Sequence, residues 1–96
     1  MSDRRRRNEI EIIYAILQGC KEGNKKTRLM YLAELNYPVF IKYIYKMEKM
    51  GLVRQEGEKY VITEKGKKVL ELLVKYKEIY KRLSEIEKNL KDIIQI

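Results

Sequence analysis

Apolar residues recur at spacings of three and four, which mark one face of a helix, in three consecutive segments of the chain. The pattern predicts a first helix that is capped by Asn8 and runs to about residue 21, a second over residues 27–35, and a third over residues 38–50 that begins at Pro38. The core-facing positions are Ile10, Ile13, Ile16, Leu17 and Cys20, then Leu29, Met30, Ala33 and Leu35, and finally Phe40, Ile44 and Met47.

Two short runs rich in strand-forming residues follow the third helix. They span residues 52–55 and 59–62, and Glu56 and Gly57 between them predict the turn of a hairpin. Thr63 is a suitable N-cap for a last helix that continues to the end of the chain. Two helices joined by a tight turn and followed by a hairpin are typical of a winged helix-turn-helix domain. The sequence therefore predicts a mainly α (α+β) fold, with a winged-helix domain over residues 8–66 and a C-terminal helix over residues 67–96.

The last helix carries the most regular apolar pattern of the chain. Its apolar residues follow the a and d positions of a coiled coil without a gap: Val69, Leu72, Tyr76, Ile79, Leu83, Ile86, Leu90 and Ile93. A helix of this length extends about 45 Å, so only its first turns can pack on their own domain, through Val69, Leu70 and Leu73. The pattern predicts a coiled coil between two chains, and the alternative is a helix that folds back along its own domain. The mixture of Leu, Ile and Tyr leaves the direction of the two helices open.

Positive charge is concentrated on the predicted helix-turn-helix. The chain holds 22 Lys and Arg and 14 Asp and Glu, which gives a net charge of +8 and a pI near 9.6. Between residues 25 and 54, seven cations accompany only Glu34 and Glu48, whereas residues 67–96 hold eight cations and five acids. This distribution is typical of a domain that attracts nucleic acid, although a basic surface can also serve solubility or attract an anionic membrane.

The third helix is the element that enters the major groove in helix-turn-helix proteins. Its outward face carries Lys42, Tyr45, Lys46 and Lys49, and Glu48 lies toward the flank. Lys25, Lys26 and Arg28 gather at the start of the second helix, where the helix dipole favours a phosphate. The alternative is an ordinary solvated face. Because the outward face holds no Asn, Gln or Arg to read adenine or guanine, we expect binding led by phosphates, with steep salt dependence and little sequence preference.

The hairpin and the N-terminus are weaker candidates for DNA contact. Arg54 and Lys59 flank the tip of the hairpin, but Glu56 and Glu58 beside them repel phosphate. Residues 1–7 form a basic N-terminal arm that ends in Arg4, Arg5, Arg6 and Arg7. This arm follows a DNA groove or serves as a solubility tail, and the sequence favours neither.

Few residues of the chain are suited to catalysis or metal binding. There is no His, and the single Cys20 falls among core-facing positions, so we expect no enzyme activity, metal, cofactor or small-molecule substrate. No signal peptide and no apolar run of roughly 20 residues is present, so we expect a cytoplasmic protein without a membrane partner. The high content of Lys, Glu, Ile and Tyr favours a thermophilic source organism.

Three stretches of this sequence, KKTRLMYLAELNY (25–37), GLVRQEG (51–57) and YVITEKG (60–66), precede the long helix. Together they resemble the ten-kilodalton winged-helix chromatin proteins of Sulfolobus-type archaea, over nearly the whole chain. The resemblance implies a nucleoid-associated archaeal protein and a homodimer joined by an antiparallel coiled coil. It also places Lys42 and Lys46 on the groove-facing helix. The chain departs from the family in the run 4–7 and in the bulky Val39, Phe40 and Ile41.

We therefore predict an architectural protein that binds double-stranded DNA with little sequence preference as a dimer. The alternative is a sequence-specific transcription regulator of the same fold. A third hypothesis is a winged helix that contacts proteins, with the basic charge serving solubility. RNA is a further partner, because phosphate attraction alone does not distinguish it from duplex DNA.

Overall fold

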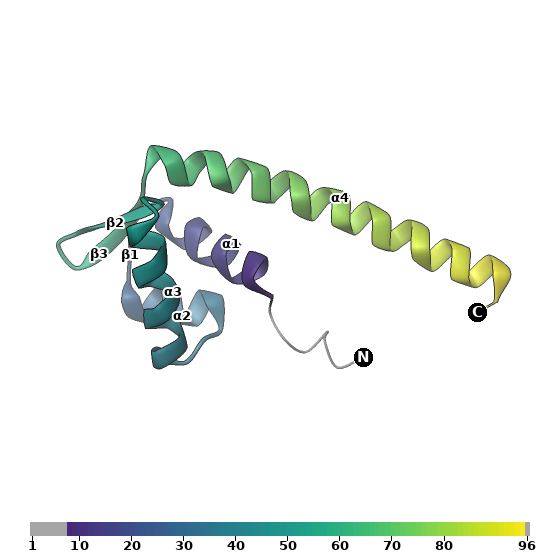
Figure 1. The fold of residues 1–96 in the computed structure, drawn as a ribbon. Coiled ribbons are helices and arrows are strands. Elements are labelled where there is room, and N and C mark those ends of the chain that lie inside the picture. Colours follow the sequence, from purple (N-terminus) through teal and green to yellow (C-terminus); the bar gives the residue numbers. More distant parts are fainter. Residues whose placement is uncertain (1–7, 96) are drawn as a thin grey trace.

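The chain forms a small winged-helix body from which one long helix projects (Figure 1). The computed structural model describes residues 8–95. In this part of the chain the elements are α1 (Glu9–Cys20), β1 (Asn24–Lys25), α2 (Lys26–Ala33), α3 (Tyr37–Lys49), β2 (Val53–Glu56), β3 (Lys59–Ile62) and α4 (Glu64–Ile94). The mainly helical winged-helix architecture is the one that the sequence predicts.

Side-chain caps determine where three of the helices begin. The side-chain oxygens of Asn8, Asn36 and Thr63 accept the first free backbone N–H groups of α1, α3 and α4. The caps at Asn8 and Thr63 confirm the sequence prediction. The cap at Asn36 starts α3 at Tyr37, one residue earlier than predicted, so Pro38 takes the second helical position instead of the first.

The sheet has three strands where the sequence predicts two. The order is β1-β3-β2, and Asn24 and Lys25 of β1 lie opposite Tyr60 and Lys59 of β3. No strand was predicted at Asn24 and Lys25. A strand of two residues has no alternation to detect, and it forms here because Asn24 also donates from Nδ2 to the backbone carbonyl of Gly19, at 2.6 Å.

Two other boundaries differ from the prediction. The second helix ends at Ala33 because Glu34 adopts a left-handed conformation (φ 57°), and Leu35 lies beyond the helix. In the hairpin, β2 begins at Val53 and includes Glu56, which pairs with Lys59 across the hairpin. Left-handed backbone favours Gly and Asn, so a Glu at this point gives no sequence signal for the end of a helix.

The body has one apolar core, to which the three short helices, the sheet and the start of α4 contribute. Phe40, Ile44 and Met47 of α3 are buried as predicted. In α1, Ile16, Leu17 and Cys20 are buried as predicted. Ile12 is buried as well, whereas the predicted Ile10 and Ile13 are only half-buried. The first turns of α4 complete the core through buried Leu70 and half-buried Val69 and Leu73, as the sequence predicts.

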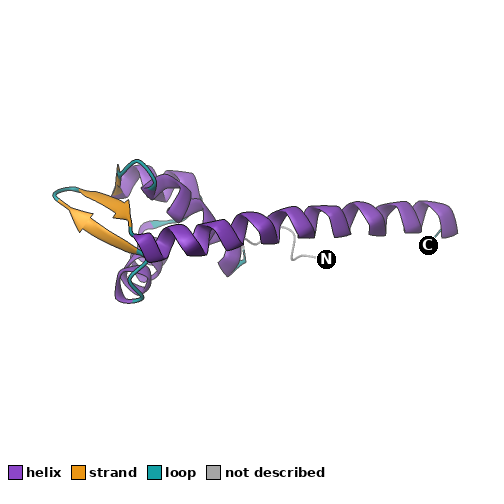
Figure 2. Cartoon of the chain, turned by 90° about the horizontal axis from the view of Figure 1, so that it is seen from above, coloured by secondary structure: helices purple, strands orange, loops and turns teal. Residues whose placement is uncertain are grey.

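Past the turn of Lys77, which contacts Tyr14 of α1, α4 projects away from the body (Figure 2). The molecule measures 55 × 26 × 19 Å, and the long dimension follows α4. The apolar residues of the predicted a and d positions are exposed along it by 43–75%: Leu72, Tyr76, Ile79, Leu83, Ile86, Leu90 and Ile93. The fold therefore leaves an apolar stripe of α4 uncovered by its own chain.

Gly66 lets the start of α4 approach the hairpin closely. A Cβ atom at this position would overlap with the backbone carbonyl oxygen of Leu52, which cannot move without shifting the chain before β2. We expect Gly66→Ala to lower the free energy of unfolding by about 2 kcal/mol, because overpacking costs roughly 1–3 kcal/mol or more and the helix propensity of Ala returns only about 1 kcal/mol. Thermal denaturation measures the change.

The matched control for this variant is Gly57→Ala at the tip of the hairpin. Gly57 has a φ of 63° and open space around it, so its substitution tests backbone strain without overlap. That strain costs about 1 kcal/mol. A Gly66→Ala protein that is as stable as the natural one would contradict the close approach.

Candidate nucleic-acid interface

The outward face of α3 presents the basic surface that the sequence predicts for the groove-facing helix. Lys42, Tyr45, Lys46 and Lys49 are all exposed, and the core-facing stripe of the same helix is buried. They line a shallow hollow of about 710 Å³ together with Val39, Tyr43, Met50 and, from α1, Glu9. The ammonium of Lys49 lies 5.2 Å from the ring centroid of Tyr45. This face combines cations with aromatic surface on a helix whose opposite side is held in the core.

One acid reaches this face from another element. Glu9, in the first turn of α1, lies 3.5 Å from the ammonium of Lys46, and both side chains are about 60% exposed. The sequence indicated that the helix face itself holds no acid, and only the fold brings Glu9 beside it. An exposed pair of this kind contributes about 1 kcal/mol or less, so a phosphate can replace the carboxylate at little cost.

Two cations at the start of α2 lie over exposed tyrosines. Lys26 lies 5.9 Å from the ring centroid of Tyr37, and Arg28 lies 5.8 Å from that of Tyr31. These rings are 53% and 73% exposed. The sequence analysis did not identify these two tyrosines as site residues. Their positions outside the core-facing pattern already indicated that their rings are exposed. They hold the cations at the surface near the N-terminus of α2, where the helix dipole favours an anion.

The extra strand places Lys25 next to the wing. Lys25 lies directly opposite Lys59 of β3, and like charges at such positions are unfavourable unless an anion offsets them. Glu58 does so for Lys25, at 3.3 Å. Lys59 in turn lies opposite Glu56 of β2. Lys25 of β1 thus joins the start of α2 to the wing, with Glu56 and Glu58 among these cations, an arrangement that the two-stranded hairpin of the prediction did not reveal.

Acids engage the remaining cations of the wing. Arg54 donates from Nε to Glu56, at 2.9 Å, and forms an ion pair with the same carboxylate. Because Glu56 and Glu58 neutralise Arg54 and Lys25 in this arrangement, the wing offers less free positive charge than α3. The predicted arm, Arg4 to Arg7, lies outside the described residues.

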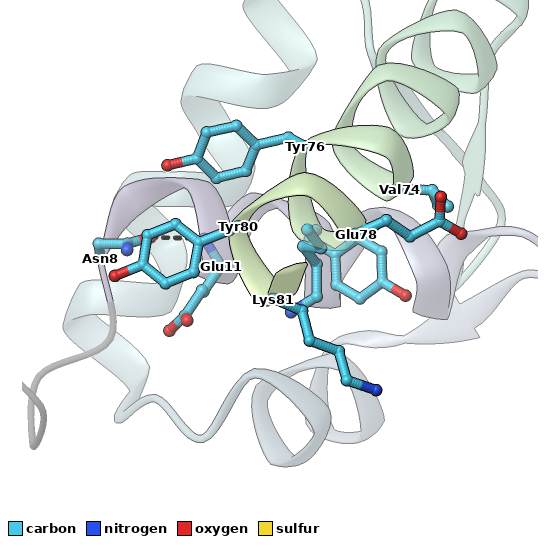
Figure 3. A pocket seen from close by; sticks show the side chains of 9 residues that line it. Asn8, Glu11, Val74, Tyr76, Glu78, Tyr80 and Lys81 are labelled. Carbon is cyan, nitrogen blue, oxygen red and sulfur yellow. Dashed lines mark hydrogen bonds between the residues drawn. The ribbon is translucent and has the colours of Figure 1, made fainter. Parts of the chain in front are cut away.

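A groove separates the N-terminal half of α1 from α4, about 500 Å³ in volume (Figure 3). Tyr14 and Val74 line it, and Tyr76 and Tyr80 of α4 lie 6.2 Å apart between ring centroids. The ammonium of Lys77 lies 4.7 Å from the ring centroid of Tyr14. This cation–π contact joins α4 to α1 one turn beyond Leu73.

The described residues offer little chemistry beyond ion pairing. Burial raises the pKa of the Cys20 thiol to about 12, so it stays protonated and unreactive at neutral pH. Within residues 8–95, no group of three or more His, Cys, Asp or Glu is placed to hold a metal ion. None of the described helices is both long and apolar enough to cross a membrane.

The fold and its basic face define a winged helix-turn-helix protein, and comparison with known proteins identifies the family. Residues 6–81 match the winged helix-turn-helix family, to which the chain belongs. The chain is similar to the uncharacterized protein MJ0287 of Methanocaldococcus jannaschii, with 40% identity over 77 residues and 79% of each chain covered. It is also 36% identical over 67 residues to the uncharacterized protein MJ0290 of the same organism, a match that covers 69% of this chain and 32% of that protein.

A solved structure extends the similarity to the long helix. The crystal structure of Sso10a-2, described as a DNA-binding protein from Sulfolobus solfataricus, superimposes with a TM-score of 0.80 and 30% sequence identity. The match covers 91% of this chain and 96% of that chain. The predicted resemblance to winged-helix proteins of Sulfolobus-type archaea is thereby confirmed.

Proposed function

We propose that this protein is an architectural DNA-binding protein that holds double-stranded DNA as a homodimer, with little sequence preference and in association with the nucleoid. The observation that carries the proposal is the exposed basic face of α3, where Lys42, Lys46 and Lys49 project from a helix anchored in the core. The DNA-binding description of Sso10a-2 supports duplex DNA as the ligand.

The composition of this face favours phosphate contact over base reading. Its outward positions offer lysines and a tyrosine, without the Asn, Gln or Arg that recognise base edges by two hydrogen bonds. Lysine is a flexible point charge that suits phosphates at many positions. Affinity should therefore fall steeply with salt and vary little from one duplex to another.

Unrelated duplexes of equal length test this function. We expect their dissociation constants to agree within about threefold at one salt concentration, because each mismatch would otherwise cost about 1–3 kcal/mol in a specific site. Titration by fluorescence anisotropy measures them, with single-stranded RNA of the same length as a further arm. A duplex that binds a hundredfold tighter than the rest would support a sequence-specific regulator instead. Tighter binding of RNA than of any duplex would indicate an RNA-binding protein.

The uncovered stripe of α4 supports the dimer. Fully burying a Leu or Ile side chain contributes about 1.5–3 kcal/mol, and several such side chains lie half exposed or more along this helix. A second copy of α4 offers the same spacing of apolar residues, so two helices can cover each other. The stripe is thus suited to a two-stranded coiled coil.

The positions of the two basic bodies favour antiparallel helices. A parallel pair would hold both bodies at one end of the rod, with Lys68 and Lys75 against Leu73 and Tyr80 of the partner and Arg82 against Glu87. An antiparallel pair centred near Lys81 instead brings the two Tyr80 rings together. It also separates the two basic bodies to opposite ends of the rod, which lowers their repulsion.

Cysteine substitutions test the direction. Antiparallel pairing matches Leu72 of one chain with Leu90 of the other, so an oxidised mixture of Leu72→Cys and Leu90→Cys should form a disulfide-linked dimer on a non-reducing gel. Either variant alone should stay unlinked, because its own copies lie at opposite ends. The natural Cys20 is fully buried and needs no replacement. Cross-linking of Leu72→Cys with itself would establish a parallel pair.

A further inference from the structure

The face of α4 that docks on the body continues as a row of lysines. Gly66 and Leu70 are buried against the body, Leu73 is half-buried, and Lys77 contacts Tyr14. Beyond the body, the same face carries Lys81, Ser84, Lys88 and Lys91, all exposed. At 3.6 residues per turn, the four residues from Lys81 on lie within about 40° of the direction of Lys77. We name Lys77, Lys81, Lys88 and Lys91 the lysine stripe.

Acids of α4 flank this face on both sides. Glu78, Glu85 and Asp92 follow one another at intervals of seven on one side of the lysine stripe, and Glu87 lies on the other side. Figure 3 shows Glu78 and Lys81 leaving α4 on different sides. Among residues 8–95, no member of the lysine stripe forms an ion pair.

The lysine stripe also adjoins the basic face of α3. Glu9 lines the hollow of α3 beside Lys46, and Asn8 and Glu11 of the same helical turn line the groove beside Lys81. The two surfaces therefore meet at the N-terminus of α1. A phosphate backbone that leaves α3 past this point passes next to the middle of α4.

The antiparallel dimer adds a second stripe to the same side. Its two-fold axis is perpendicular to the plane of the paired helices, so the docking faces of both α4 helices lie on one side of the rod. Both winged-helix bodies and both lysine stripes then share that side. With Lys81 near the centre of the pairing, Lys88 and Lys91 of each chain lie level with residues 74 and 71 of the partner, beside the partner's body.

We infer that the lysine stripe of α4 is a second phosphate-binding surface, which contacts the same DNA duplex as the winged-helix bodies of the dimer. The inference rests on the proposed function, since it extends the duplex site beyond α3 and the start of α2. Phosphate is the ligand chemistry that matches these cations, because they share one face of the helix, are flexible and form no ion pair among residues 8–95.

A triple variant with a matched control tests the inference. Lys81→Gln, Lys88→Gln and Lys91→Gln together remove the exposed part of the stripe. Lys68→Gln, Lys75→Gln and Arg82→Gln remove the same charge from another face of α4. Both triples keep the a and d positions, and sedimentation checks that both remain dimers. The measured quantity is the slope of log K against log salt for one long duplex.

Each phosphate contact contributes about 0.9 to that slope. We expect the stripe triple to reduce the slope by about 2 or more and to weaken binding at least tenfold at 0.1 M salt. In the control triple, we expect both the loss of slope and the loss of affinity to be less than half as large. Equal changes in both triples, or none in the stripe triple, would overturn the inference. The variant Lys42→Glu with Lys46→Glu is measured alongside. If the Lys42→Glu, Lys46→Glu variant loses binding while the stripe triple binds normally, only the role of the lysine stripe is refuted. If the Lys42→Glu, Lys46→Glu variant itself binds normally, the proposed function is refuted.

Discussion

Replacing Leu83 and Ile86 by lysine should convert the protein to a monomer and weaken DNA binding about a hundredfold or more. In the antiparallel pairing these residues face Ile79 and Tyr76 of the partner, so the double variant places four ammonium groups in the centre of the seam. Burying an unpaired charge costs several kcal/mol. The protomer itself should stay folded, because both side chains are about half exposed and contact no other element.

The loss of binding would come from lost bivalency. Two linked modules gain roughly 10²–10⁴ in apparent affinity over one module without any new contact. The substitutions add positive charge, which by itself would strengthen attraction to DNA, so weaker binding cannot be a charge effect. Ser84→Lys with Asn89→Lys adds the same charge outside the seam and should remain a dimer. Sedimentation gives the mass, and an unchanged dimer in the Leu83→Lys, Ile86→Lys protein would refute the coiled coil.

The sequence predicted best those features in which one pattern repeats over many residues. The uninterrupted a and d positions predicted both the long helix and its uncovered stripe, and capping residues predicted the starts of α1 and α4 at Asn8 and Thr63. The core-facing stripe of α3 was equally readable, because Phe40, Ile44 and Met47 alternate with outward lysines over three turns.

Features that depend on contacts between distant segments could not be predicted in this way. The strand at Lys25 exists only because β3 lies beside it, and the acid beside Lys46 comes from the start of another helix. The lysine stripe was overlooked for a different reason. Its residues are regular in the sequence, but only the docking of Leu70 and Lys77 reveals that the stripe continues the face which holds the body.

Charge reversal on α3 should have the largest effect of any surface change. Lys42→Glu with Lys46→Glu removes two phosphate contacts from each body and places carboxylates against the duplex. We expect the slope of log K against log salt to fall by about 4 for the dimer, and the affinity at 0.1 M salt to fall about a thousandfold or more. Stability should change by less than about 1 kcal/mol, because Lys42 is exposed and the pair of Lys46 with Glu9 is mostly exposed.

Lys68→Glu with Lys75→Glu is the matched control, since it makes the same change of net charge on a face of α4 away from both basic surfaces. Anisotropy titrations against one duplex at several salt concentrations, with thermal denaturation of each protein, separate lost contacts from lost folding. If the α3 variant binds as tightly as the control, the basic charge serves solubility and the winged helix contacts a protein. If only the α3 variant loses binding, α3 contacts the duplex as expected of a groove-facing helix, and its lysines bind the phosphates.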